Sequence, residues 1–490
     1  MRLIAIAVLA AAFVITGTAF AETDSPAPPE QQSATDTGAR LASYMRQAAT
    51  AYQTGDHEAW VRALEQVHQL RPHNQDVMRQ LVMGYSLLED LHLAFNMMLK
   101  MQQQGLAEDW DEIDEVAIMR PHRLYEHLNT LMTEAGQPFG DAEVFTRLDG
   151  LVRMPETLAH DPASGRFFVG TVREGLILAS TDGEDWQPFA SPETVDGLMS
   201  VFSLAVDAER GHLWVATGMI AQFRQFDADQ AGRTGLLKLD LQSGELIETY
   251  WVDAGGQPSV LGSIALASDG TVYAADTVRP IIFRLKPGDA APAPFFAHQV
   301  LTSLRGITLS GDDRLLYMAD YDMGIFIAET DGDSAWKLAV PETLNESGID
   351  GLYWWDHHLV AIQNNISPQR VLRLQLGEDG LGVTAVAPLL SAQPEFDVPT
   401  YGTIVDNDLY FLASSHWQSV DNRGRPLRRL PETPIMRTAI DTTEVLVVGA
   451  DMLERMRREA EEAERREREA RGEFDEDELW PVPRIFPDGR

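Results

Sequence analysis

The chain has 490 residues, 44% of them hydrophobic, and a formal net charge of −36 at pH 7. This length suggests two domains with a sizeable core, whereas so acidic a surface repels phosphate backbones and argues against nucleic acid as a partner. The chain has no cysteine, which excludes disulfides, zinc–thiolate sites and cysteine nucleophiles.

Residues 1–21 have the pattern of a secretory signal peptide. Arg2 supplies a positive start, Leu3 to Ile15 form an apolar run, and Ala19-Phe20-Ala21 gives the small-x-small cleavage pattern. The run is shorter than the roughly 20 residues that a membrane span needs, and no later segment is long and apolar enough. We therefore expect cleavage, no membrane span afterwards, and a periplasmic or secreted location. A bacterium fits best, because a secreted chain without cysteine has no disulfides to support its fold.

The segment after the signal changes from polar to helical character. Residues 22–37 are rich in Pro, Ser, Thr and Gln, which predicts a disordered linker. Over residues 38–142 apolar residues recur at helical spacing, which predicts an α-helical domain.

Two stretches of this helical region align with each other, 52–60 and 85–95, and a helix stop and restart at Arg71-Pro72-His73-Asn74 lies between them. The pattern resembles tetratricopeptide repeats. The matching positions are Pro72, Asn74, Gly84, Tyr85 and Ala94. The resemblance implies either a groove that binds a protein partner or a helical cap on the next domain.

From residue 143 to residue 449 the apolar pattern has a period of two. Six stretches share one design, a strand, a polar turn and a second strand, and most continue into a third strand. They are residues 155–170, 201–218, 261–276, 305–320, 349–364 and 400–415. Repeated units of this size predict a mainly β fold, a six-bladed β-propeller.

Residues 450–490 form a charged tail. Pairs such as Glu454 with Arg458 stand at i,i+4 and favour a solvated helix. The end of the tail, with Trp480 and Phe486, is either a disordered extension or a short apolar anchor for a protein partner.

The six repeats predict a site where the innermost strands begin, because their first residues ring one mouth of a propeller's channel. Aligning the repeats puts these residues in one column: Glu156, Phe202, Gly262, Arg305, Asp350 and Tyr401. Ser203 and Ser263 follow in the same turns, and Asp320 and His416 lie at or just beyond the ends of second strands. We take Ser203, Ser263, Asp320, Tyr401 and His416 as candidate contacts for a small molecule at this mouth.

At these turns the sequence resembles the SMP-30/gluconolactonase propellers. Pro155-Glu156-Thr157 and Asp350-Gly351-Leu352 are similar to two turns that hold a divalent cation in that family. The resemblance implies Glu156 and Asp350 as metal ligands and a lactone as substrate. Two other turns depart from the family pattern, because Gly262-Ser263 and Arg305-Gly306-Ile307 stand where asparagine ligands are expected.

The departure at Arg305 bears on whether a cation binds. Calcium prefers about six to eight oxygen ligands, and a guanidinium that is always protonated repels a cation. We therefore expect no cofactor, with Arg305 pairing with Glu156 and Asp350 in place of the metal. The alternative keeps Ca²⁺ or another divalent cation, and Arg305 then binds a carboxylate or lactone oxygen of a substrate.

Two functions follow from these alternatives. One is a binding or interaction protein of the cell envelope with a degenerate metal site. The other is a lactone or ester hydrolase, in which Glu156 or Asp350 is the general base and Arg305 stabilises an oxyanion.

Overall fold

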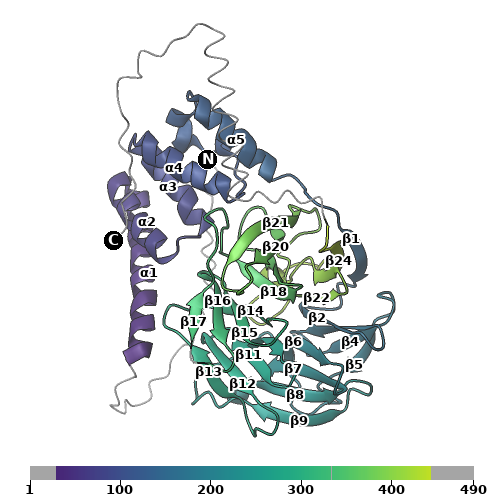
Figure 1. The fold of residues 1–490 in the computed structure, drawn as a ribbon. Helices are drawn as coiled ribbons and strands as arrows, with labels where there is room; N and C mark the ends of the chain where they lie inside the picture. Colours follow the sequence, from purple (N-terminus) through teal and green to yellow (C-terminus); the bar gives the residue numbers. More distant parts are fainter. Residues whose placement is uncertain (1–28, 333, 443–490) are drawn as a thin grey trace.

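The computed structural model describes residues 29–332 and 334–442. The predicted signal peptide, the first part of the linker and the charged tail lie outside these residues. The described chain forms a helical part followed by a propeller (Figure 1).

The helical part contains five α-helices and two short 3₁₀ helices in chain order. They are α1 (Pro29–Thr54), α2 (His57–Leu70), α3 (Gln75–Leu87), α4 (Leu91–Gln103), η1 (Trp110–Glu112), η2 (Asp114–Met119) and α5 (Arg123–Ala135). Asp56, Asn74 and Asp90 are the N-caps of α2, α3 and α4, and each side chain accepts a hydrogen bond from a backbone N–H in the first turn. No described helix is both long enough and apolar enough to cross a membrane.

Helix α1 corrects the prediction for the linker. It begins at Pro29, so residues 29–37 are helical, although their composition predicts disorder. Proline is tolerated in the first turn of a helix, and the glutamate, glutamines and alanine that follow it are good helix formers. The relation of α2 to α4 with tetratricopeptide repeats stays a prediction.

The propeller consists of six four-stranded antiparallel sheets, which confirms the predicted fold class. Blades one to three are β2 (Pro155–Asp161), β3 (Arg166–Thr171), β4 (Ile177–Ser180), β5 (Gln187–Ala190); β6 (Ser200–Asp207), β7 (His212–Gly218), β8 (Thr234–Asp240), β9 (Leu246–Trp251); and β10 (Leu261–Leu266), β11 (Val272–Asp276), β12 (Ile281–Leu285), β13 (Ala293–Ala297). Blades four and five are β14 (Leu304–Leu309), β15 (Leu315–Asp320), β16 (Gly324–Glu329), β17 (Ala335–Lys337); and β18 (Ile349–Trp355), β19 (His358–Gln363), β20 (Arg370–Leu376), β21 (Val383–Ser391). Blade six is β22 (Gly402–Val405), β23 (Asp408–Leu412), β24 (Thr433–Ala439) and β1 (Glu143–Leu148).

Blade six closes the ring, because its outermost strand is the first strand of the chain. The order β1-β24-β23-β22 pairs Leu148 with Thr433, so both ends of the propeller lie in one sheet. Apolar clusters fill the spaces between blades. One of them joins Phe168 of blade one to Val215 and Leu237 of blade two. The closed ring holds the six inner strands around one channel.

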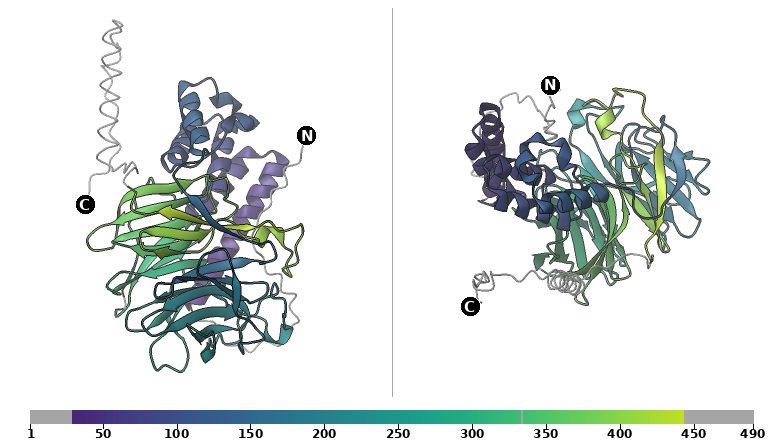
Figure 2. Two further views of the ribbon diagram at one scale, coloured as in Figure 1. Left: turned by 90° about the vertical axis from the view of Figure 1, so that its right-hand side faces the viewer. Right: turned by 90° about the horizontal axis from the view of Figure 1, so that it is seen from above.

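The helical part sits on the loops of blades four and five at the end of the channel where the inner strands begin. Arg71 pairs with Asp322 at 3.1 Å, and the Gln75 side-chain oxygen accepts a 2.6 Å hydrogen bond from the Ser367 backbone N–H. Figure 2 shows the helices of the helical part gathered over one side of the propeller, so this part of the described chain does not cover the loops of the other blades. The mouth of the channel therefore has two different flanks.

Candidate functional site at the channel mouth

The predicted column of residues coincides with an interruption in the inner strands. The pairing of the innermost strand with its neighbour skips Glu156 in blade one, Phe202 in blade two and Asp350 in blade five. Gly262 is skipped in blade three, and Arg305 and Gly306 lie in the corresponding gap of blade four. A β-bulge bends the strand and re-aims a side chain, so the repeated bulge explains how one column of the sequence comes to surround the mouth.

Arg305 is the fixed positive charge of the mouth. Its Nε lies 3.9 Å from Oδ1 of Asp350, and its guanidinium lies 5.0 Å from the centroid of the Tyr321 ring. Burial works against its charge, but Asp350 and the surrounding tyrosines raise the pKa of the guanidinium above its ordinary value. The Nε atom is buried and has no hydrogen-bond partner within the described chain. Arg305 is thus charged and incompletely paired.

Asp350 is held by blade five itself. Its Oδ2 accepts a 2.7 Å hydrogen bond from Nδ2 of Asn364, whose Oδ1 accepts a 2.7 Å bond from the Tyr321 hydroxyl. Burial raises the pKa of the Asp350 carboxyl, whereas Arg305 and the hydrogen bonds from Asn364 and Tyr401 lower it. Asn364 also lines a second cavity of about 520 Å³ between the helical part and the propeller.

Glu156 has a different environment on the opposite flank. Its Oε2 accepts a 2.7 Å hydrogen bond from the indole N–H of Trp417, which lies in η4 (Trp417–Ser419). Burial raises the pKa of Glu156 to about 8, and the negative charge of Asp350 acts in the same direction, while Trp417 and Arg305 oppose it. At neutral pH this side chain is therefore mainly a neutral acid that can donate a hydrogen bond.

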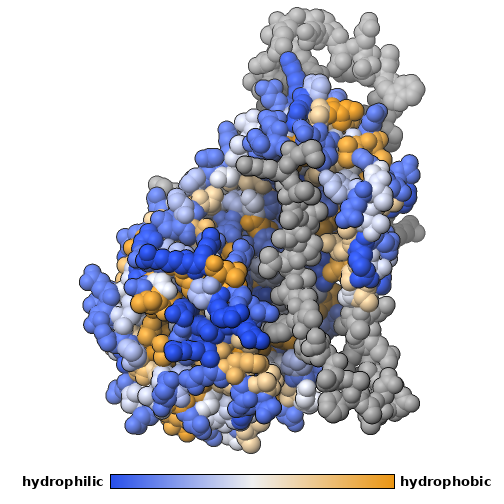
Figure 3. All heavy atoms as spheres, turned by 180° about the vertical axis from the view of Figure 1, so that it is seen from behind, coloured by the Kyte–Doolittle hydropathy of each residue, from blue (hydrophilic) through white to orange (hydrophobic). Residues whose placement is uncertain are grey.

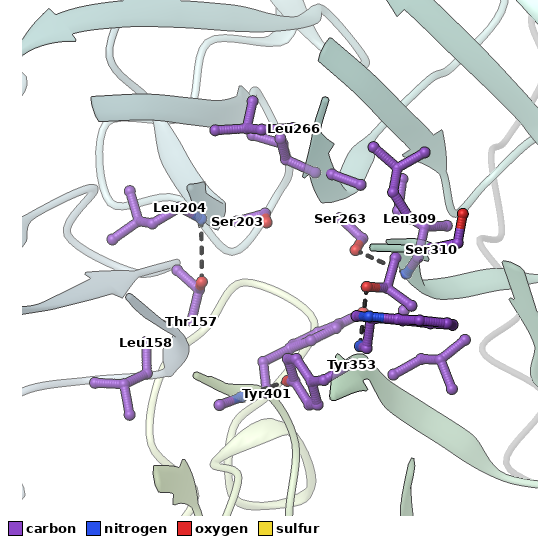
Figure 4. Close-up of a pocket in the computed structure, with 18 of the residues that line it drawn as sticks. Thr157, Leu158, Ser203, Leu204, Ser263, Leu266, Leu309, Ser310, Tyr353 and Tyr401 are labelled. Carbon is purple, nitrogen blue, oxygen red and sulfur yellow. Dashed lines mark hydrogen bonds between the residues drawn. The ribbon is translucent and has the colours of Figure 1, made fainter. Parts of the chain in front are cut away.

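Tyr401 and the two predicted serines lie where the mouth continues into the channel. Figure 4 shows Ser203, Ser263 and Tyr401 around an open space, with the Tyr401 ring reaching toward its middle. This channel cavity has a volume of about 320 Å³. The Ser263 hydroxyl accepts a 3.3 Å hydrogen bond from the Ile307 backbone N–H, which links blades three and four. A polar mouth thus opens onto a channel lined by hydroxyl and aliphatic groups.

The structure does not bring Asp320 or His416 to this mouth. Asp320 is fully buried, and its carboxylate accepts hydrogen bonds from the turns on either side, including the Thr302 hydroxyl at 2.7 Å and the Met323 backbone N–H at 3.0 Å. His416 is buried as well, with Nδ1 accepting from the Met154 backbone N–H and Nε2 next to the Thr433 hydroxyl. Both predicted contacts instead stabilise loops, because neighbouring chain already occupies their polar atoms.

Sequence reasoning missed two residues of the mouth, Tyr321 and Asn364, and of the adjacent pair His416-Trp417 it chose His416, whereas Trp417 reaches the mouth. Asn364 is the last residue of the fifth repeat stretch, and Trp417 directly follows His416. Their positions at the ends of second strands are a usable signal, since those ends return to the edge where the inner strands begin.

The residues of the mouth do not fit a divalent cation. Among the described residues of the mouth, Glu156 and Asp350 are the carboxylates, fewer oxygens than a calcium ion needs, and Arg305 lies 3.9 Å from Asp350. Within residues 29–332 and 334–442, no three histidine, aspartate or glutamate side chains are grouped so that they could hold a metal ion. The side chain of Asn364 directs its N–H group at Asp350, and its amide oxygen accepts a hydrogen bond from Tyr321 instead. A cation needs oxygen ligands, so the N–H group cannot help to hold one.

Fold and site together define a six-bladed β-propeller with a polar channel mouth centred on an arginine. No protein-family model matches the sequence, and no curated protein matches it either. Solved structures with a similar fold include a luciferin-regenerating enzyme, with 13% identity over 64% of this chain and 98% of that one and a TM-score of 0.43.

Two further solved neighbours are a calcium-binding regucalcin from Agrobacterium tumefaciens and a gluconolactonase from Xanthomonas campestris. The regucalcin is 15% identical over 60% of this chain and 96% of its own, with a TM-score of 0.41. The gluconolactonase is 13% identical over 61% and 95%, with a TM-score of 0.40. At these values the likeness carries no argument about activity, and the assignment of the fold rests on the six sheets themselves.

Proposed function

We propose that this protein is an exported binding protein of the cell envelope whose channel mouth holds a small organic anion without a metal ion. The observation that carries the proposal is the state of Arg305, whose buried Nε has no hydrogen-bond partner among the described residues and lies 3.9 Å from Asp350. An unpaired donor at a concave polar mouth favours a ligand oxygen, and a carboxylate matches the guanidinium fork.

The acids at the mouth support the same ligand. Glu156 is mainly neutral at pH 7, so it does not repel a carboxylate and can donate a hydrogen bond to it. Asp350 is restrained by Asn364, which keeps one of its oxygens engaged away from Arg305. The Arg305 guanidinium is therefore open to a second, external anion.

Calorimetric titration of the mature protein with unbranched monocarboxylates, from butyrate to decanoate, tests the proposal. We expect binding by wild type, and a loss of about 10- to 100-fold in affinity on Arg305→Gln, because a charge-assisted hydrogen bond contributes about 1.5–3 kcal/mol. The matched control is Arg314→Gln, which changes an exposed arginine in the turn between β14 and β15. The proposal is wrong if Arg305→Gln binds as well as wild type. A tight calcium signal that Glu156→Gln abolishes would equally overturn its metal-free site.

A second candidate function is hydrolysis of a lactone or similar ester. It is favoured by two carboxyl groups with different surroundings, since Glu156, with a pKa of about 8, can act as the acid while Asp350, held by Asn364 and beside Arg305, acts as the base. Arg305 would stabilise the oxyanion. Acid release from a panel of γ- and δ-lactones tests it. We expect Asp350→Asn to abolish turnover while monocarboxylate binding persists, and a rate equal to buffer alone for wild type excludes it.

A further inference from the structure

Three arginines converge on one glutamate at the rim of the mouth. Glu174 lies in the loop between β3 and β4, and Arg153, Arg173 and Arg224 all lower the pKa of its carboxyl, against the larger raising effect of burial. They come from three loops, before β2, between β3 and β4, and between β7 and β8. Nη1 of Arg153 lies 3.9 Å from the Glu174 carboxylate. Arg224 also lowers the pKa of a second carboxyl, that of Glu193. Two carboxylates among three guanidiniums still leave one positive charge in excess at this rim, on a chain whose net charge is −36.

The positive rim is joined to the mouth by the segment between β23 and β24. Trp417 of this segment donates its hydrogen bond to Glu156 in the mouth. A few residues further on, the backbone oxygen of Arg423 accepts a 2.8 Å hydrogen bond from Nη1 of Arg173. Arg153 precedes Glu156 by only three residues. The arginines therefore stand on the flank of the mouth that the helical part leaves uncovered.

The polar groups of the rim are not fully paired. Nε of Arg173 and Oε2 of Glu174 are buried without a hydrogen-bond partner in the part of the chain that the structure describes. Arg224 is exposed, and Arg153 keeps 38% of its side chain accessible. Figure 3 shows strongly hydrophilic side chains gathered beside apolar ones on the face of the propeller seen from behind. Guanidiniums that are exposed and only loosely paired can bind an external anion.

We propose that this rim is a second anion-binding subsite, so that the ligand of the mouth carries two anionic groups, one at Arg305 and one at Arg153 and Arg224. The inference rests on the proposed function, because it uses the same ligand and adds a second point of attachment. Arg173 is a positioning residue, since its Nη1 is already bonded to the backbone oxygens of Gln222 and Arg423.

The experiment compares α,ω-dicarboxylates, from succinate to sebacate, with monocarboxylates of equal length by calorimetry on the mature protein. We expect one length of dicarboxylate to bind at least about tenfold more tightly than its monocarboxylate, because two linked contacts act together. Arg224→Gln, and separately Arg153→Gln, should remove this preference and leave monocarboxylate affinity unchanged. Arg314→Gln, which lies in the turn at the far end of β14, is the control.

The outcomes separate the inference from the function on which it rests. If dicarboxylates and monocarboxylates bind equally, and the rim variants change neither affinity, the second subsite is refuted while the role of Arg305 stands. If neither class binds, the proposed function fails, and the inference fails with it. A preference for dicarboxylates that survives both rim variants would place the second contact elsewhere and also refute the assignment to Arg153 and Arg224.

Discussion

Two buried polar regions of this molecule contain the same kinds of side chain but differ in how those side chains are paired. At the seam between the helical part and the propeller, Arg370 donates to Oε1 of Gln363 at 2.8 Å and to the Gln104 backbone oxygen at 2.9 Å, and only its Nη2 is buried without a partner in the described chain. At the channel mouth, Arg305 has no hydrogen bond within the described chain and a carboxylate oxygen only at 3.9 Å. Two nitrogen atoms of the seam arginine thus make short hydrogen bonds to the protein, whereas the arginine of the mouth meets its carboxylate only at the longer distance.

The difference indicates what each region does. Short bonds between buried groups fix a geometry, and removing one partner leaves the other desolvated and unpaired. Loosely paired charges in a concave site leave interactions free for a ligand. Changes at the seam should therefore affect stability first, and changes at the mouth should affect binding and titration first.

The largest effect on stability is expected from Gln363→Ala at the seam. Gln363 is fully buried, and its amide donates 2.8 Å hydrogen bonds to the backbone oxygens of Asn345 and Ser347 while accepting one from Arg370. Its removal leaves two carbonyls and the Nε–H of the buried Arg370 guanidinium unpaired, which costs about 3–5 kcal/mol. Urea unfolding followed by circular dichroism measures the loss.

The matched control for this variant is Gln375→Ala. Gln375 lies on the same strand pair, β19 with β20, but its side chain is exposed. We expect a change within about 0.5 kcal/mol. If the two variants lose equal stability, the seam is not the network of buried bonds that its geometry indicates.

A smaller, pH-dependent effect is expected from Glu156→Gln at the mouth. The ordinary pKa of this carboxyl is 4.5, and in the folded protein it is about 8. Between these values the folded state holds more protons than the unfolded state, so stability falls as pH rises through this window. The variant cannot ionise and escapes this loss. A full shift from 4.5 to 8 corresponds to about 5 kcal/mol, and contact of the partly exposed side chain with water reduces this. We expect the variant to lie close to wild type near pH 5 and to exceed it by on the order of 2 kcal/mol near pH 9.

Urea unfolding of both proteins across this pH range gives the difference directly. Glu184→Gln is the control, because that glutamate is exposed in the turn between β4 and β5 and its carboxyl is in water. A difference between wild type and Glu156→Gln that does not grow with pH would mean that Glu156 ionises normally in the folded protein.

The blades could be predicted from the sequence because each repeat contains a complete local pattern of strand, turn and strand. The alternation of apolar residues and the polar turn lie within one strand pair, so all six repeats could be aligned, and the alignment placed Glu156, Arg305 and Asp350 in one column. The structure shows the same column as strand bulges. Local pattern therefore sufficed for both the fold and the centre of the mouth.

Features that depend on distant segments could not be predicted in this way. The path of residues 416–432 decides that Trp417 meets Glu156, while His416 next to it turns into the core. Asp320 pairs with Leu304 as Gln363 pairs with Ile349, so it lies one position before the equivalent of Asn364, and the turns around it take up its oxygens. Composition alone also gave the wrong state for residues 29–37, because proline and serine are compatible with the start of a helix.

The smallest effect is expected from Trp417→Phe, which keeps the ring but removes the indole donor. The 2.7 Å bond from Trp417 favours the ionised form of Glu156 and is the strongest of the influences that lower its pKa. Its loss should raise the pKa above about 8, by one unit or less, which corresponds to about 1 kcal/mol. The pH at which wild type and variant lose stability reports this shift.

Trp355→Phe is the control for the last variant, since that indole donates to Asn407 at 3.2 Å, away from the mouth. It should leave the titration of Glu156 unchanged. A pKa that stays the same in Trp417→Phe would show that the indole hydrogen bond does not influence the ionisation of Glu156. The segment that carries Trp417 would then act only as a wall of the mouth, and its link to the positive rim would rest on Arg173 alone. A rise in the pKa would instead show that the uncovered flank tunes the acid that meets the ligand, a role that the bonded seam on the other flank does not share.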